Sequence, residues 1–165
     1  MQKFTRRAVL AAAFLIAAIF ASDALLAAAM SPAEVAKGYL AAWNAKDVDK
    51  AASFYADDVE YFDVTLAEAH KGKDAAREVV QVFVTAAPDL KWEMKGDPIV
   101  SDDGIAFQWT FSGTNTGAWG PDTPATNKPF TFDGVTFMRI KDGKITYQGD
   151  YYDGYTFGKQ LGWYQ

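Results

Sequence analysis

The C-terminal segment holds two carboxylates three residues apart, Asp150 and Asp153, among tyrosines and a tryptophan. A carboxylate packed against apolar rings loses hydration, which raises its pKa toward neutrality and suits it to proton transfer. We therefore take Asp150 and Asp153 as candidate catalytic residues. Because Gly154 follows Asp153, that aspartate could instead be only the N-cap of a C-terminal helix.

The two carboxylates lie at the end of a predicted strand, in which side chains alternate between faces. Alternation places Ile145, Tyr147, Gly149, Tyr151 and Asp153 on one face, and Thr146, Gln148, Asp150 and Tyr152 on the other. One carboxylate therefore faces a pocket while the other faces solvent or the helices, unless the strand ends or bulges between them. A bulge of one residue would exchange the two.

Asp63 and His70 are two further polar residues with side chains suited to a site. Asp63 ends a predicted strand and either points into the pocket, where it would bind substrate, or begins a turn. His70 is the only histidine, and the sequence favours an exposed loop for it. A single imidazole without clustered carboxylates is a poor metal site, so no metal is expected.

Several classes of chemistry have no motif in this chain. There is no cysteine, which excludes a disulfide framework, a thiolate nucleophile and a zinc–thiolate site. A Ser-His-Asp set, a phosphate-binding glycine loop and a dinucleotide fingerprint are also missing. Proton transfer or simple binding of a ligand remain as tasks.

Aromatic residues make up 15% of the chain, more than a small core requires. They could line a ligand pocket and would suit a hydrophobic small molecule. The alternative is that each is simply part of the core. The substrate-binding candidates besides Asp63 are Trp43, Tyr55, Trp92, Trp109, Phe137 and Tyr151.

Residues 1–29 have the pattern of an export signal: Lys3, Arg6 and Arg7 precede an uncharged apolar run, and small residues follow. Cleavage after Ala24 or after Ala29 fits, and the second is preferred because Ser31 opens the first helix. The apolar run is short for a membrane span. A single domain over residues 30–165, periplasmic or secreted, is expected. The Arg6-Arg7 pair allows a twin-arginine signal.

The whole chain carries a formal charge of −5, and removal of residues 1–29 would change it to −7. An acidic domain without a basic stripe is not expected to bind nucleic acid. The membrane would be involved only through the export signal.

The pattern of elements predicts helices first and strands afterwards. Ser31-Pro-Ala-Glu34 has the residues of a capping box and begins a helix that runs to about Ala45. Asp47 can cap a second helix through Ala51, Phe54 and Tyr55, and a third runs from Asp74 to about Ala86. A strand is expected over residues 59–63, between the second and third helices.

Beyond Pro88 the apolar period changes from about 3.6 to 2, which indicates strands. The alternation slips at Asp133-Gly134, which suggests a bulge, and Asp142-Gly143 is typical of a type I′ hairpin. Residues 113–128 form one long loop. The predicted class is α+β, with helices on one face of a curved antiparallel sheet.

The chain resembles the SnoaL-like polyketide cyclases of the nuclear transport factor 2-like superfamily over nearly all of residues 30–165. The segments that carry the resemblance are Ala41-Ala-Trp-Asn-Ala-Lys-Asp47, Tyr55-Ala-Asp-Asp58, Lys71-Gly72, Ala87-Pro-Asp89, Gly113-Thr-Asn-Thr-Gly117, Pro124-Ala-Thr-Asn-Lys128, Asp142-Gly-Lys-Ile145 and Gln160-Leu-Gly162. The resemblance implies a cone-shaped, cystatin-like α+β barrel with an apolar pocket, often dimeric.

In the characterised cyclases an aspartate seven residues before Gln-Leu-Gly acts as general acid and base without metal or organic cofactor. Asp153 stands at that offset from Gln160. Asn115 occupies the place of a histidine in many relatives and is expected to assist catalysis by donating a hydrogen bond. The expected activity is cyclase, isomerase or hydratase chemistry on a small carbonyl compound; a non-catalytic binding module and a domain that dimerises through its sheet are the alternatives.

Overall fold

The structure is a computed structural model that describes residues 30–66 and 68–164. The helices are α1 (Pro32–Ala45), α2 (Val48–Ala52), α3 (Lys73–Ala86) and α4 (Gly154–Leu161). The strands are β1 (Tyr55–Asp63), β2 (His70–Lys71), β3 (Lys91–Val100), β4 (Gly104–Thr114), β5 (Pro129–Lys141) and β6 (Lys144–Tyr152). The predicted export signal, residues 1–29, lies outside the described residues.

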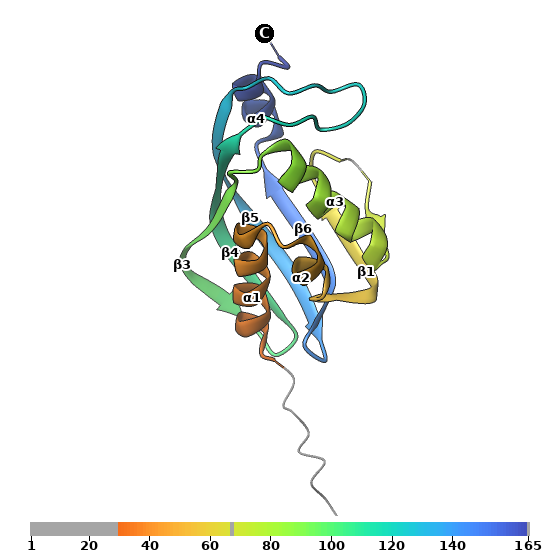
Figure 1. The fold of residues 1–165 in the computed structure, drawn as a ribbon. Coiled ribbons are helices and arrows are strands. Elements are labelled where there is room, and N and C mark those ends of the chain that lie inside the picture. The colour runs from red at the N-terminus through yellow and green to blue at the C-terminus, as the bar shows by residue number, and fades with distance from the viewer. Residues whose placement is uncertain (1–29, 67, 165) are drawn as a thin grey trace, which may run out of the picture.

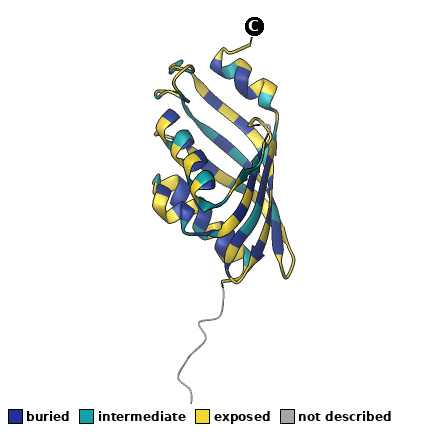
Figure 2. Ribbon diagram, turned by 90° about the vertical axis from the view of Figure 1, so that its right-hand side faces the viewer, coloured by how far each residue is buried: buried dark blue, intermediate teal, exposed yellow. Residues whose placement is uncertain are grey.

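The strands form one curved sheet in the order β2-β1-β6-β5-β4-β3. Neighbouring strands run antiparallel except β1 and β6, which pair in parallel. In Figure 1, α1, α2 and α3 cover one face of the sheet, and Figure 2 shows the same layers from the side. The α+β class with helices on one face is therefore confirmed, while the parallel pair is a feature that alternation does not reveal.

Local sequence signals explain the helix boundaries. The hydroxyl of Ser31 accepts a hydrogen bond from the Glu34 amide, and the Glu34 carboxylate accepts one from the Ser31 amide at 2.8 Å, so the predicted capping box is present. The predicted first and third helices are confirmed. The second is shorter than expected: α2 ends at Ala52, and Tyr55 begins β1.

The expected bulge at Asp133-Gly134 is wrong. Strand β5 pairs with β4 without a register shift, and Gly134 faces inward opposite Trp109. A Cβ at residue 134 would overlap the Trp109 indole, so a glycine that makes room for a large ring interrupts the apolar alternation. The bulge lies instead in β6, between Ile145 and Tyr147, and it turns Ile145 into the core.

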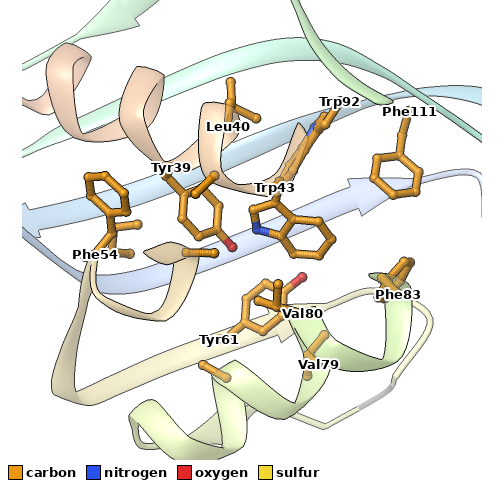
Figure 3. Packing of buried hydrophobic residues seen from close by; sticks show 14 of the residues in the cluster. Tyr39, Leu40, Trp43, Phe54, Tyr61, Val79, Val80, Phe83, Trp92 and Phe111 are labelled. Atoms are coloured by element: carbon orange, nitrogen blue, oxygen red, sulfur yellow. The ribbon is translucent and has the colours of Figure 1, made fainter. Parts of the chain in front are cut away.

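The interior of the cone is filled by aromatic rings (Figure 3). Trp43 from α1 lies at the centre of this cluster, with its ring centroid 5.1 Å from that of Trp92, 6.0 Å from Phe83 and 6.3 Å from Phe111. All three contacts are edge-to-face, the arrangement that aromatic quadrupoles favour. The helices and the sheet are thus joined mainly through rings.

Two connections between strands are predicted from the sequence: the turn at Asp142-Gly143 and the long loop before β5. The Asp142-Gly143 turn has φ angles of 51° and 72°, both positive as the predicted type I′ turn requires. Residues 115–128 form the long loop, which lies at the same end of the molecule as α4 (Figure 1). No helix in the described part of the chain is long and apolar enough to span a membrane.

Candidate active site

A small cavity lies inside the cone, with about 20 Å³ of open space, enough for about one water molecule. Its walls are mostly aromatic, and two carboxylates reach it. The lining residues are Trp43, Tyr61, Asp63, Phe83, Trp92, Trp109, Phe111, Phe132, Asp150 and Tyr152. An aromatic cavity with two convergent acids is the default candidate for a reaction site.

The parallel pairing of β1 and β6 brings the two carboxylates together. Asp63 and Asp150 are direct partners in the register of these strands, and their side chains are 2% and 3% exposed. Two carboxylates this close disfavour ionisation of each other. Because the two residues are far apart in the sequence, the local pattern does not predict that they are neighbours.

Asp150 is the more strongly perturbed of the two acids. Burial, and then the charge of Asp63, raise its pKa to about 7, although hydrogen bonds from Thr136, Gln148 and Tyr61 lower it. The Thr136 hydroxyl donates to Oδ1 at 2.5 Å, and Tyr61 Oη and Gln148 Nε2 donate to Oδ2 at 2.9 and 2.8 Å. Near neutral pH both the acid and the base form of Asp150 are therefore populated.

Asp63 is held by a separate set of donors. Its Oδ1 accepts the amide and hydroxyl of Thr65 at 2.8 and 2.6 Å, and Tyr152 Oη donates to Oδ1 at 2.9 Å. Burial raises the pKa of Asp63 despite these bonds and the nearby His70. Both predicted placements of Asp63 are therefore present: its side chain lines the cavity and also caps the turn after β1. Its binding of a substrate stays a prediction.

Further hydrogen bonds orient Thr136 and Gln148, two of the residues that donate to the carboxylate of Asp150. Trp109 Nε1 donates to Thr136 Oγ1 at 2.8 Å, which leaves the Thr136 proton for Asp150. Gln148 Oε1 accepts from Tyr55 Oη at 3.4 Å, and the Tyr55 hydroxyl contacts that of Tyr39. The amide of Gln148 is therefore oriented with its NH₂ toward Asp150.

Asp153 does not reach the cavity, which corrects the expectation that placed it there. Strand β6 ends at Tyr152, and Asp153 is the exposed N-cap of α4, where it accepts hydrogen bonds from the hydroxyl and amide of Thr156 at 2.5 and 3.0 Å. These bonds lower its pKa. An exposed carboxylate with a lowered pKa is poorly suited to proton transfer at neutral pH, and the capping alternative describes it.

Asn115 is also placed away from the cavity. Its NH₂ donates to the carbonyls of Ala86 and Gly117 at 3.2 and 2.6 Å, and its side-chain oxygen accepts the amide and hydroxyl of Thr126 at 2.9 and 3.0 Å. It is fully buried. The bonds to Gly117 and Thr126 lie within the long loop, and the bond to Ala86 joins the loop to the end of α3. The expected role as a catalytic donor is therefore corrected to a structural one.

The aromatic candidates lie in three different places. Trp43, Trp92 and Trp109 line the cavity, as expected for a pocket wall. Tyr55 is buried behind Gln148 and does not line it. Phe137 and Tyr151 are 39% and 46% exposed on the outer face of the sheet. They alternate with the buried side chains of Thr136 and Met138 on β5 and of Asp150 on β6.

Comparisons with known proteins decide the family. The model of the SnoaL-like polyketide cyclase family matches residues 33–161. The chain belongs to this family. Comparison with curated proteins gave no significant match.

Several solved structures are similar to this SnoaL-like protein. The candidate polyketide cyclase IdmH from Streptomyces antibioticus shares 21% identity, with a TM-score of 0.67 over 81% of this chain and 99% of that one. The candidate hydroxylase AclR from Streptomyces galilaeus shares 21% over 82% and 100%, with a TM-score of 0.68. A candidate SnoaL-like cyclase from Jannaschia sp. CCS1 shares 14% over 81% and 93%, with a TM-score of 0.71. These likenesses establish the fold, which carries more than one chemistry.

Sequence reasoning missed several residues of the SnoaL-like site: Tyr61, Phe83, Phe111, Phe132, Thr136, Gln148 and Tyr152. Part of the signal was present. Alternation along β6 already grouped Gln148 and Tyr152 with Asp150, and continuing the phase of Phe130 and Phe132 along β5 would have placed Thr136 inward. The assumed bulge at Gly134 concealed that phase.

A second, wider space of about 810 Å³ lies between α3, the long loop and α4, and we call it the outer groove. Phe83 lines both the outer groove and the inner cavity. His70, expected in an exposed loop, lies on β2 and also lines the outer groove. Within the described residues, no group of three or more His, Cys, Asp or Glu side chains is placed to hold a metal ion.

Proposed function

We propose that this SnoaL-like protein is a cofactor-independent acid/base enzyme that acts on a small apolar carbonyl compound, with Asp150 as the proton-transferring group. The observation that carries this proposal is the burial of Asp150 in an aromatic cavity, where its pKa is raised to about 7. Perturbed acids at a cavity wall are concentrated at functional sites.

The proposed chemistry needs one group that changes protonation state. Ionised Asp150 removes a proton from the carbon next to a carbonyl, and the resulting acid returns it at another carbon or oxygen of the substrate. In a cyclase reaction the enolate attacks a second carbonyl of the same substrate, and in an isomerase reaction it is protonated at another atom. The aromatic walls exclude water, which protects an enolate from premature protonation. Trp43 and Trp92 both line the cavity, and the buried Nε1 of each has no acceptor among the described residues. These two N–H groups are the candidate donors for the enolate oxygen.

The size of the two spaces supports a division of the substrate. Ligand pockets usually measure about 300–1,000 Å³, so the inner cavity of about 20 Å³ has room for no more than one small group of the substrate's reacting end. The outer groove of about 810 Å³ has room for the remainder. Phe83 separates the two, and a substrate reaches Asp150 past its ring.

The alternative is a non-catalytic binding module for a hydrophobic small molecule. The small volume of the inner cavity favours it, since a ligand could occupy the outer groove alone. In that case Asp150 would serve the fold through its three hydrogen bonds and would not exchange protons with a ligand.

Export and association stay predictions. Export to the periplasm or medium rests on residues 1–29, and the mass of the processed chain would test cleavage near Met30. A homodimer is supported by apolar side chains on the outer face of the sheet, where Val135, Phe137 and Tyr151 are 41%, 39% and 46% exposed. Sedimentation at several concentrations would test it.

Proton abstraction can be measured without knowledge of the natural substrate. Small ketones such as 2-butanone and cyclohexanone exchange hydrogens next to the carbonyl for deuterium in D₂O, and NMR follows the loss of proton signal. The proposal predicts exchange above the protein-free rate. It also predicts a reduction of about 10²–10⁴-fold, toward the protein-free rate, in Asp150→Asn, the usual contribution of a positioned base.

Asp153→Asn is the matched control, because it removes a neighbouring carboxylate while asparagine still caps a helix. It should keep wild-type exchange. Exchange that survives in Asp150→Asn but is lost in Asp153→Asn would contradict the assignment. Binding of a ketone without any exchange in the wild-type protein would favour the binding module.

A further inference from the structure

The outer groove has an electrostatic character of its own. Glu78 on α3 and Asp122 in the long loop line it, both carboxylates are exposed, and neither forms an ion pair with a described residue. No described Lys or Arg lines the groove; His70 is its only basic side chain. Unpaired carboxylates around a groove attract a positively charged ligand.

Five of the side chains that line the outer groove are large aromatic rings: Phe83, Trp119, Phe157, Trp163 and Tyr164. Trp119 lies at their centre, with ring centroids 5.0 Å from Phe83, 5.7 Å from Phe157 and 6.0 Å from Trp163. These four rings come from α3, the long loop, α4 and the C-terminal tail. A cation is attracted to the face of an aromatic ring, and aromatic cages with acidic neighbours are the known means of binding substituted ammonium groups.

Exposed apolar surface gathers around the same groove. Leu66, Trp163 and Tyr164 are 39%, 39% and 49% exposed and all line it. The tail that carries Trp163 and Tyr164 is held in place, because the Tyr164 ring stacks on that of Tyr155 at 5.5 Å and packs over Gly158. Fixed, exposed aromatic surface at a groove is typical of a ligand site.

We propose that the outer groove binds an apolar organic cation, such as a substituted ammonium, between the Trp119 cluster and the carboxylates of Glu78 and Asp122. This inference rests on the proposed function only in treating the outer groove as the entrance to the cavity of Asp150. It names the class of substrate: an apolar carbonyl compound that carries its positive charge away from the reacting end. Neutral and anionic compounds of the same shape bind more weakly.

A pair of isosteric probes tests the proposal. Phenyltrimethylammonium and tert-butylbenzene differ only in a positively charged nitrogen in place of a carbon, and ligand-observed NMR measures the binding of each to the protein. The cation should bind roughly tenfold more tightly, the size expected of a cation–π contact reinforced by carboxylates. Its affinity should fall with added salt because the two carboxylates are exposed.

Variants locate the effect. The double change Glu78→Gln and Asp122→Asn should weaken the cation several-fold and leave tert-butylbenzene unchanged. Glu93→Gln with Asp97→Asn removes the same charge from β3, outside the outer groove, and should leave both affinities unchanged. Trp119→Leu should weaken the cation more than the isostere, with the melting temperature recorded to establish folding.

Three results would overturn the proposal: equal affinity for the two probes, no binding of the cation, or an equal loss in the β3 control, which would show only the net charge of the protein. None of these measurements involves turnover. The outer groove can therefore fail as a cation site while Asp150 still transfers protons, and the reverse outcome is equally visible.

Discussion

At the scale of single residues, the site depends on how differently the fold treats two aspartates of one short segment. Asp150 is buried among rings with its pKa raised to about 7, and Asp153 is an exposed helix cap with its pKa lowered. Both accept several hydrogen bonds, so hydrogen bonding alone does not separate them. Burial and the charge of Asp63 raise the pKa of Asp150, whereas Asp153 is exposed and its hydrogen bonds dominate.

The donors around Asp150 give a prediction. Tyr61→Phe keeps the ring but removes the hydroxyl that donates to Oδ2 at 2.9 Å. A hydrogen bond to a charged group contributes about 1.5–3 kcal/mol, so the pKa of Asp150 should rise by roughly one to two units. Titration of the Asp150 carboxyl carbon by NMR measures this shift.

Tyr152→Phe is the control for that change. Its hydroxyl donates to Asp63 and not to Asp150, so its removal disfavours the charge of Asp63 and should not raise the pKa of Asp150. If Tyr61→Phe left the pKa of Asp150 unchanged, the hydroxyl would not stabilise the ionised form.

At the scale of elements, the sequence predicted the helices well and the strand phases only in part. The capping box of α1, the third helix and the Asp142-Gly143 turn have local signals that involve neighbouring residues, and all are found. The inward position of Gly134 depends on Trp109, a residue of another strand. The pairing of Asp63 with Asp150 likewise depends on strand order, which the local pattern does not contain.

The contact of Gly134 with Trp109 predicts a local failure of packing. Gly134→Ala places a methyl group against the indole, which must shift and disturb its bond to Thr136. Overpacking of this kind costs typically 1–3 kcal/mol of the free energy of unfolding, which urea denaturation measures. Gly120→Ala, with no atom near the added Cβ, should change that free energy much less. Equal losses in the two variants would show that the contact has no energetic weight.

At the scale of the whole molecule, the aromatic core that stabilises the fold disfavours the ionised form of the acidic site. The rings that make the cone stable also exclude water from Asp150, so the fold is under strain when this residue is ionised. Phe83 on α3 contacts the rings of Trp43, Phe111 and Trp119. These contacts lie between the small inner cavity and the wide outer groove, both of which Phe83 lines. Stability and function are therefore linked through protonation.

This link predicts the pH dependence of stability. The folded pKa of Asp150, about 7, lies above its ordinary value of 3.8, so between these values the folded state binds more protons than the unfolded state. The free energy of unfolding should therefore fall as pH rises through this range, by up to ~4 kcal/mol from Asp150 alone. The raised pKa of Asp63 acts in the same direction.

Thermal unfolding between pH 5 and pH 8 measures this effect. Wild type should lose melting temperature over this range, and Asp150→Asn should lose clearly less because the residue no longer titrates. Asp153→Asn should follow wild type. An identical pH dependence in wild type and Asp150→Asn would mean that Asp150 is ionised in the folded protein throughout this range.

The most direct test of the account is a pH titration of Asp150 and Asp153 in the folded protein by carbon-detected NMR. We predict a pKa of about 7 for Asp150 and a pKa below the ordinary value of 3.8 for Asp153. If Asp150 titrated near that ordinary value, its carboxylate would be solvated and the acid/base assignment would fail. If Asp153 had the raised pKa instead, the proton-transferring group would be the one that the structure places outside the cavity.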